Sequence, residues 1–129
     1  MDNPLAGRRM LVVEDEMMVL LNIEDVLANL GCASVTAAAT SARALELIEE
    51  QVFDLAMLDI NLDGKTSVAV AEALAARGVP FLFSTGYSDY DLGEAWRDRP
   101  VLEKPYTDLA LAAVIERLLP AAQPEPIAA

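Results

Sequence analysis

The chain has 129 residues, contains no histidine and a single cysteine, and has few basic residues. The lack of histidine excludes histidine metal sites, a histidine general base and a Ser-His-Asp triad. Cys32 has no partner for an internal disulfide, and its place beside Gly31 between apolar segments predicts a small core thiol. The 9 basic residues stand against 21 acidic ones, and the net charge of −12 argues against binding to nucleic acid or to an anionic membrane surface.

Long apolar runs are also missing. No stretch approaches the ~20 residues of a membrane span, and the N-terminus lacks the apolar segment of a secretory signal. These features predict a cytoplasmic protein with no membrane contact. The 54% hydrophobic fraction suits one core in one domain. We expect a flexible lead at 1–8, a domain at 9–119, a disordered tail at 120–129 rich in Pro and Ala, and no attached output domain.

Short apolar runs alternate with stretches of helical period. Strands are predicted at 10–13, 33–37, 54–58, 80–84 and 101–103. Helices are predicted at 16–30, from a Thr40 or Ser41 cap through Glu50, and at 67–77. A further helix is predicted weakly from Ser88, because Gly93 falls inside it, and a last one from a Thr107 cap up to Pro120. A polar turn is expected at 61–66. This alternation predicts an α/β fold, with a five-stranded parallel sheet doubly wound by helices on both faces.

Some side chains are assigned to the interior by their spacing. In the helix at 41–50, the inward stripe is expected to consist of Ala44, Leu45 and Ile48. The methionines at positions 10, 17, 18 and 57 are interpreted as core filler or local packing.

Carboxylates follow two of the predicted strands. Glu14 and Asp15 come after the run 11–13, and Asp59 comes after the run 55–58. In an open parallel sheet the strand ends share one edge, where ligands bind in a crevice. Clustered like charges need compensation, and a hard cation such as Mg²⁺ is the obvious choice. A simpler interpretation is that Glu14 and Asp15 only favour the positive end of the first helix.

Five features therefore fall at predicted strand ends: Glu14 with Asp15, Asp59, Ser84-Thr85-Gly86, and Lys104 with Pro105. As an ordered set, they resemble the receiver domains of two-component response regulators, from Met10 to Leu119. The resemblance implies the flavodoxin-like fold of CheY-like receivers. The segment Phe83-Ser84-Thr85-Gly86-Tyr87 is similar to the signature of the FAT GUY receiver subgroup, with Ser84 in place of alanine.

The resemblance implies a cation site for Mg²⁺ or Mn²⁺. Asp15 and Asp59 match the direct acidic ligands, and Asn61 matches the position whose backbone carbonyl completes the site. Glu14 replaces a more common aspartate, and its extra methylene favours contact through water.

The resemblance also implies a phosphoryl pocket. Asp59 matches the phosphoacceptor, and Thr85 and Lys104 match the hydroxyl and the ammonium that contact the phosphoryl group. Gly86 matches the small residue beside that group, and Pro105 matches a proline that follows a cis peptide bond.

The implied function is that of a stand-alone receiver, phosphorylated by a histidine kinase or a histidine phosphotransfer protein. It promotes its own aspartyl phosphorylation and dephosphorylation but is not a metabolic enzyme. Its output is binding to another protein, or drawing phosphoryl groups from another receiver. Val101 stands where many receivers have a switch aromatic, so the activating change is expected between Thr85 and Asp98.

Two other functions fit parts of the pattern. A phosphatase of the haloacid dehalogenase class also uses an aspartate nucleophile and Mg²⁺. That class needs a second aspartate two residues later, where this chain has Asn61, and it needs room for a cap domain. A receiver-like interaction module that is never phosphorylated is the second alternative, and the complete set of pocket residues argues against it.

Overall fold

The computed structural model of the chain describes residues 7–62, 65–85, 99–103 and 106–118. Five parallel strands form one sheet, as predicted, and the structure shows their order to be β2-β1-β3-β6-β7. They are β1 Arg9–Val13, β2 Ser34–Ala38, β3 Leu55–Asp59, β6 Phe81–Thr85 and β7 Val101–Glu103. Residues 1–6 of the expected lead at 1–8, the helix expected from Ser88 and the expected tail at 120–129 lie outside the described residues.

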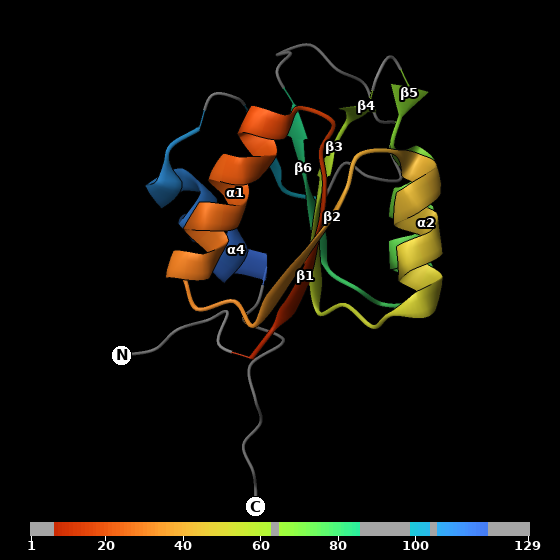
Figure 1. Cartoon of the computed structure of the whole chain (residues 1–129), viewed down its shortest axis with the longest axis horizontal. Coiled ribbons are helices and arrows are strands. Elements are labelled where there is room, and N and C mark those ends of the chain that lie inside the picture. The colour runs from red at the N-terminus through yellow and green to blue at the C-terminus, as the bar shows by residue number, and fades with distance from the viewer. Residues whose placement is uncertain (1–6, 63–64, 86–98, 104–105, 119–129) are drawn as a thin grey trace, which may run out of the picture.

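Helices cover both faces of this sheet (Figure 1). The helices α1 Met17–Asn29 and α4 Asp108–Leu118 lie on one face, and α2 Ser41–Glu50 and α3 Val68–Ala76 lie on the other. Each helix therefore buries one apolar stripe against strands that are buried on both sides. The predicted doubly wound α/β architecture is confirmed.

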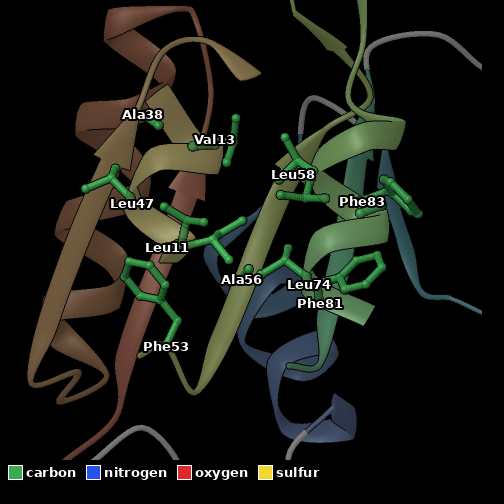
Figure 2. Packing of buried hydrophobic residues seen from close by; sticks show 14 of the residues in the cluster. Leu11, Val13, Ala38, Leu47, Phe53, Ala56, Leu58, Leu74, Phe81 and Phe83 are labelled. Atoms are coloured by element: carbon green, nitrogen blue, oxygen red, sulfur yellow. The ribbon is translucent and has the colours of Figure 1, made fainter. Parts of the chain in front are cut away.

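The core on the α2/α3 face is built from alternate strand residues and one stripe of each helix (Figure 2). Leu11, Ala56 and Phe81 face Leu47 of α2 and Leu74 of α3 across this layer. Phe81 also packs edge-on against Phe83, with ring centroids 5.4 Å apart. The predicted α2 stripe lacked Leu47, which is buried there, whereas Leu45 is partly buried and packs against this core.

The core on the α1/α4 face contains the other strand residues. Met10 and Met57 are buried in it, which confirms their assignment to the interior. Met17 and Met18 are 65% and 79% exposed, so the interpretation of these two residues as core filler was wrong. The reason is helical phase: the buried face of α1 passes through Ile23, Val26 and Leu27, and the two methionines lie off it.

Short polar and glycine signals set the helix ends. The hydroxyl oxygens of Thr40 and Thr107 accept hydrogen bonds from the third following backbone N–H, at 3.1 Å and 3.0 Å, so the predicted caps of α2 and α4 are present. Gly31 and Gly78 adopt φ values of 87° and 72° after α1 and α3. At each position the N–H groups of the glycine and of the next residue donate hydrogen bonds to carbonyl oxygens in the last turn of the helix. This pair of bonds is the Schellman motif, which ends the helix.

Cys32 is half-buried and packs against the core on the α1/α4 face, so it lies at the edge of the core rather than inside it. It directly follows the Gly31 helix stop, on the connection that returns to the sheet. Its Sγ lies 3.2 Å from the carbonyl oxygen of Ser34 and 3.4 Å from that of Arg8, so the thiol hydrogen has backbone acceptors. Burial raises the pKa of this thiol, and the Asp54 carboxylate adds to the increase.

The predicted polar turn at 61–66 is instead a short antiparallel pair, β4 Asn61–Leu62 and β5 Lys65–Thr66. It stands at the carboxyl end of β3 (Figure 1). Two-residue strands are too short to show the alternating pattern that predicts a strand, so the polar sequence alone indicates a turn there. No helix in the described parts of the chain has the length and apolar character that a bilayer crossing requires.

Candidate functional site

The strand order reverses at β1, which pairs with β2 on one side and β3 on the other. The chain after β1 leads to a helix on one face, and the chain after β3 leads to a helix on the other. Such a switch point leaves a crevice at the carboxyl ends of the two strands. Glu14 and Asp15 follow β1 directly, and Asp59 is the last residue of β3. The topology therefore brings together carboxylates that are more than 40 residues apart in the sequence.

The three carboxylates meet closely. One oxygen from each of Glu14, Asp15 and Asp59 lies within 4.8 Å of the others. Glu14 and Asp59 are only 2% and 6% exposed, whereas Asp15 is exposed. Two oxygens bound to one octahedral Mg²⁺ at 2.0–2.1 Å lie roughly 3 to 4 Å apart. The spacing and the all-oxygen donor set therefore fit a hard divalent cation, with one open side at Asp15.

Glu14 is held from two directions. Its backbone N–H donates to the carbonyl oxygen of Ala38 at 3.0 Å, which extends the pairing of β1 with β2. Its Oε2 accepts a hydrogen bond from the backbone N–H of Glu16 at 3.1 Å, just before α1. The helix-end interpretation and the cluster interpretation therefore apply to the same residue, because Glu14 binds the backbone that leads into α1 while it faces Asp15 and Asp59.

Hydrogen bonds also fix the chain on the other side of Asp59. Asp59 pairs in register with Ser84, and the next residue, Ile60, donates its N–H to the Ser84 carbonyl at 2.9 Å. The carbonyl of Ile60 accepts from the N–H of Ser67 at 3.1 Å. Asn61, whose carbonyl was assigned to the cation site, opens β4 immediately after this anchored segment.

Thr85 is the last residue of β6, and it is 1% exposed. It pairs with Glu103, the last residue of β7. Lys104 and Pro105, which follow Glu103, lie outside the described residues, as does Gly86, which follows Thr85. The predicted phosphoryl pocket is thus described at Asp59 and Thr85 alone.

Val101, at the position of the switch aromatic, is half-buried and pairs with Phe83. It packs against the core on the α2/α3 face. Close to it, the guanidinium carbon of Arg99 lies 4.4 Å from the ring centroid of Phe81. This end of the sheet is therefore occupied by apolar and cation–π packing.

From the sequence, Ser84 was interpreted as a small residue that on its own favours a turn over a functional hydroxyl. In the structure Ser84 is 1% exposed, and its hydroxyl has no hydrogen-bond partner within the described chain. The signal that was available is its position: it directly precedes Thr85 on a strand whose other residues, Phe81, Leu82 and Phe83, are apolar.

Comparison with known proteins gives consistent results. The family model for the response regulator receiver domain matches residues 10–116. SdrG from Sphingomonas melonis Fr1 is 43% identical in sequence, with a TM-score of 0.78 over 92% of this chain and 99% of that one. A BeF3-activated conformation of SdrG, from Pseudomonas melonis Fr1, is 44% identical, with a TM-score of 0.72 over 86% of this chain and 97% of that one.

Among curated proteins, the transcriptional regulatory protein PdtaR of Mycobacterium tuberculosis is 29% identical over 113 residues, or 84% of this chain. The match covers 55% of PdtaR, so the chain spans about half the length of this relative. Strand order, the clustered carboxylates and the match over residues 10–116 lead to one assignment. The chain belongs to the response regulator receiver domain family of two-component signalling.

Proposed function

We propose that this receiver domain accepts a phosphoryl group on Asp59 from a histidine kinase or a histidine phosphotransfer protein, and that phosphorylation changes its binding to another protein. The observation that carries the proposal is the meeting of Glu14, Asp15 and Asp59 within 4.8 Å at the switch point of the sheet. Receiver domains bind Mg²⁺ at an acidic pocket, and this cluster has the donor set for it.

Asp59 is the nucleophile in this proposal. One carboxylate oxygen forms a bond to phosphorus, while the bond from phosphorus to the donor's imidazole nitrogen breaks and its electron pair stays on that nitrogen. The transfer depends on positioning and charge, so a fixed carboxylate is the main requirement. Asp59 meets this requirement because Ile60, its neighbour, is hydrogen-bonded to Ser84 and Ser67. The Thr85 hydroxyl and the Lys104 ammonium are proposed to contact the transferred group.

The cation would be held by Asp15 and Asp59 directly, by the Asn61 carbonyl, and by Glu14 through water. Bound Mg²⁺ or Mn²⁺ supplies positive charge against the carboxylates and the phosphoryl oxygens. One oxygen of Glu14 already accepts a hydrogen bond from the Glu16 N–H, which favours contact with the cation through water over direct coordination. Asp15 is exposed, so the open side of the cluster faces the donor.

The donor protein must bring its phosphoryl group to Asp59, and therefore must cover the carboxyl edge of the sheet. Next to this edge, the first two turns of α1 expose Met17, Met18 and Leu21 at 65%, 79% and 52%. Exposed methionines adapt to varied apolar partners. We propose that these three side chains, here called the α1 apolar patch, contact the phosphodonor protein.

The FAT GUY subgroup is proposed as the place of this chain within the family, from the segment Phe83 to Tyr87. Val101 packs among apolar residues, so a rotating aromatic switch is not part of the proposal. The activating change is instead assigned to the segment from Thr85 to Asp98. The BeF3-activated conformation described for SdrG supports the use of beryllofluoride as the phosphoryl mimic for this chain.

The direct test is phosphorylation by acetyl phosphate with Mg²⁺, followed by mass spectrometry and mapping of a base-labile adduct. We expect one phosphoryl group on Asp59, none after Asp59→Asn, and normal labelling of the control Asp25→Asn, whose side chain lies exposed on α1. Labelling of Asp59→Asn would contradict the assignment. A wild-type protein that is never labelled would favour the interaction module, and turnover of general phosphate esters would favour a phosphatase.

A further inference from the structure

A buried hydroxyl lacks a partner next to the phosphoacceptor. The Ser84 side chain is 1% exposed, and its Oγ has no hydrogen-bond partner in the described part of the chain. A buried hydroxyl without a hydrogen-bond partner destabilises the folded protein, because the group loses its bond to water and gains none, while an alanine there would carry no such penalty. Groups of this type call for an explanation, and a ligand-dependent role is one.

Strand register places this hydroxyl on the same face as the Asp59 side chain. One step back along the same face, Met57 pairs with Leu82, and both are buried in the core on the α1/α4 face. Because side chains alternate along a strand, the pair Asp59 and Ser84 returns to that face. Adjacent strands lie about 4.8 Å apart, so the two side chains are direct neighbours.

The backbone around Ser84 leaves the hydroxyl little choice of partner. Its carbonyl is committed to the N–H of Ile60 at 2.9 Å, which locks the register beside Asp59. Its paired neighbour on the other side is Leu102, whose side chain offers no acceptor. The only polar side chain beside Ser84 in these two register pairs is therefore that of Asp59.

We propose that Ser84 is a second hydroxyl donor of the phosphoryl pocket, one that hydrogen-bonds the Asp59 side chain only after it carries a phosphoryl group. This inference rests on the proposed function. Phosphorylation adds three strong acceptor oxygens to a side chain whose carboxylate does not accept the Ser84 hydroxyl in the present state. The group that destabilises the unphosphorylated protein then stabilises the phosphorylated one, which shifts the switch toward its active state.

The test measures the thermal midpoint and the beryllofluoride affinity of the full chain with Mg²⁺, for wild type, Ser84→Ala and a matched control. Ser41→Ala is the control, because the Ser41 hydroxyl is also buried without a partner in the described chain but opens α2, on the other face. Both variants should melt higher than wild type when no beryllofluoride is present. Only Ser84→Ala should bind beryllofluoride more weakly, by about tenfold, as expected for one lost bond to a charged group.

The two readouts separate a role in the switch from a role in folding. A purely structural serine would change the melting of the free and the bound forms alike and leave the beryllofluoride affinity unchanged, and that result would overturn the proposal. A shorter lifetime of the acetyl-phosphate adduct in Ser84→Ala would support it independently. If wild type binds no beryllofluoride and is not labelled at Asp59, the proposed function and this inference fail together. If wild type responds and Ser84→Ala responds equally, only this inference fails.

Discussion

Glu14 accepts a hydrogen bond through Oε2 from the backbone N–H of Glu16, and an oxygen of the same carboxylate group belongs to the cluster with Asp15 and Asp59. The residue thus joins the start of α1 to the acidic site. Its charge would attract the cation of the proposed site, while its Oε2 accepts the hydrogen bond from the Glu16 N–H. These two contributions are separable, because glutamine keeps an acceptor oxygen and loses the charge.

Glu14→Gln is expected to fold as stably as wild type or slightly more so, because it removes one of three repelling charges. Its affinity for Mg²⁺ should fall roughly tenfold, the change that about 1.4 kcal/mol of lost attraction produces. Glu14→Ala should lose the same affinity and also about 1 kcal/mol of stability, since the Glu16 N–H loses its acceptor. Metal titrations followed by amide chemical shifts measure the affinity for Mg²⁺, and urea unfolding measures the stability. Equal Mg²⁺ affinity in Glu14→Gln and wild type would exclude the glutamate from the cation site.

The thiol of Cys32 predicts a pH dependence at the opposite end of the sheet. Burial raises its pKa, and the nearby Asp54 carboxylate adds to this effect, so the folded protein holds the thiol proton to higher pH than the unfolded chain does. Stability should therefore be constant with respect to this group below the ordinary thiol pKa of about 8.5, and decline as the pH rises beyond it. Cys32→Ala should flatten that decline. Thiolate absorbance of the folded and the urea-unfolded protein checks the order of the two pKa values, and a lower value in the folded protein would refute this prediction.

Gly78 predicts a stability effect that involves no contact. Its φ is 72°, and a Cβ built there would meet nothing within 4 Å. Gly78→Ala should therefore cost about 1 kcal/mol through left-handed backbone strain alone. Gly78→Asn should cost less, because asparagine tolerates this conformation. Urea unfolding of the three proteins gives the comparison. A loss of several kcal/mol in Gly78→Ala would point to a steric clash that the structure does not have.

The sequence predicted the sheet well because buried parallel strands are short apolar runs, and the helices between them repeat with a helical period. It predicted the cluster of Glu14, Asp15 and Asp59 because strand ends share an edge whatever the details of packing. Exposure was harder to predict. Met17 and Met18 are as apolar as the buried Met10 of β1, and only the rotation of α1 about its own axis turns these two away from the sheet.

The role of Ser84 was beyond sequence reasoning for a related reason. Serine is common in turns and costs nothing at a surface, so the residue alone carries no signal. Its significance depends on the register with Asp59 and on the missing partner, both of which are properties of the assembled sheet. The β4 and β5 pair likewise arises where the chain leaves β3, from two-residue strands too short to show alternation.

The α1 apolar patch predicts a difference between protein and small-molecule phosphodonors. Met17→Ser and Met18→Ser remove exposed apolar surface beside the acidic cluster and leave its carboxylates in place. Labelling of Asp59 by acetyl phosphate should therefore be unchanged. Transfer from a cognate histidine kinase or phosphotransfer protein should slow through weaker binding, by about thirtyfold or more for the pair of changes, since each buried methionine contributes roughly 1 kcal/mol or more.

Val52→Ser is the matched control for this experiment. Val52 is 66% exposed, nearly the same fraction as Met17, but it lies before β3, away from the carboxyl edge of the sheet. This substitution should change neither the labelling by acetyl phosphate nor the transfer from the donor protein. Rapid-quench transfer at several concentrations of the donor protein distinguishes weaker binding from slower chemistry, because weaker binding disappears at saturation. If the double methionine variant slows labelling by acetyl phosphate as much as it slows transfer from the protein donor, the methionines act on the pocket itself. If it slows neither, the donor docks elsewhere on the carboxyl edge and the α1 apolar patch has another partner.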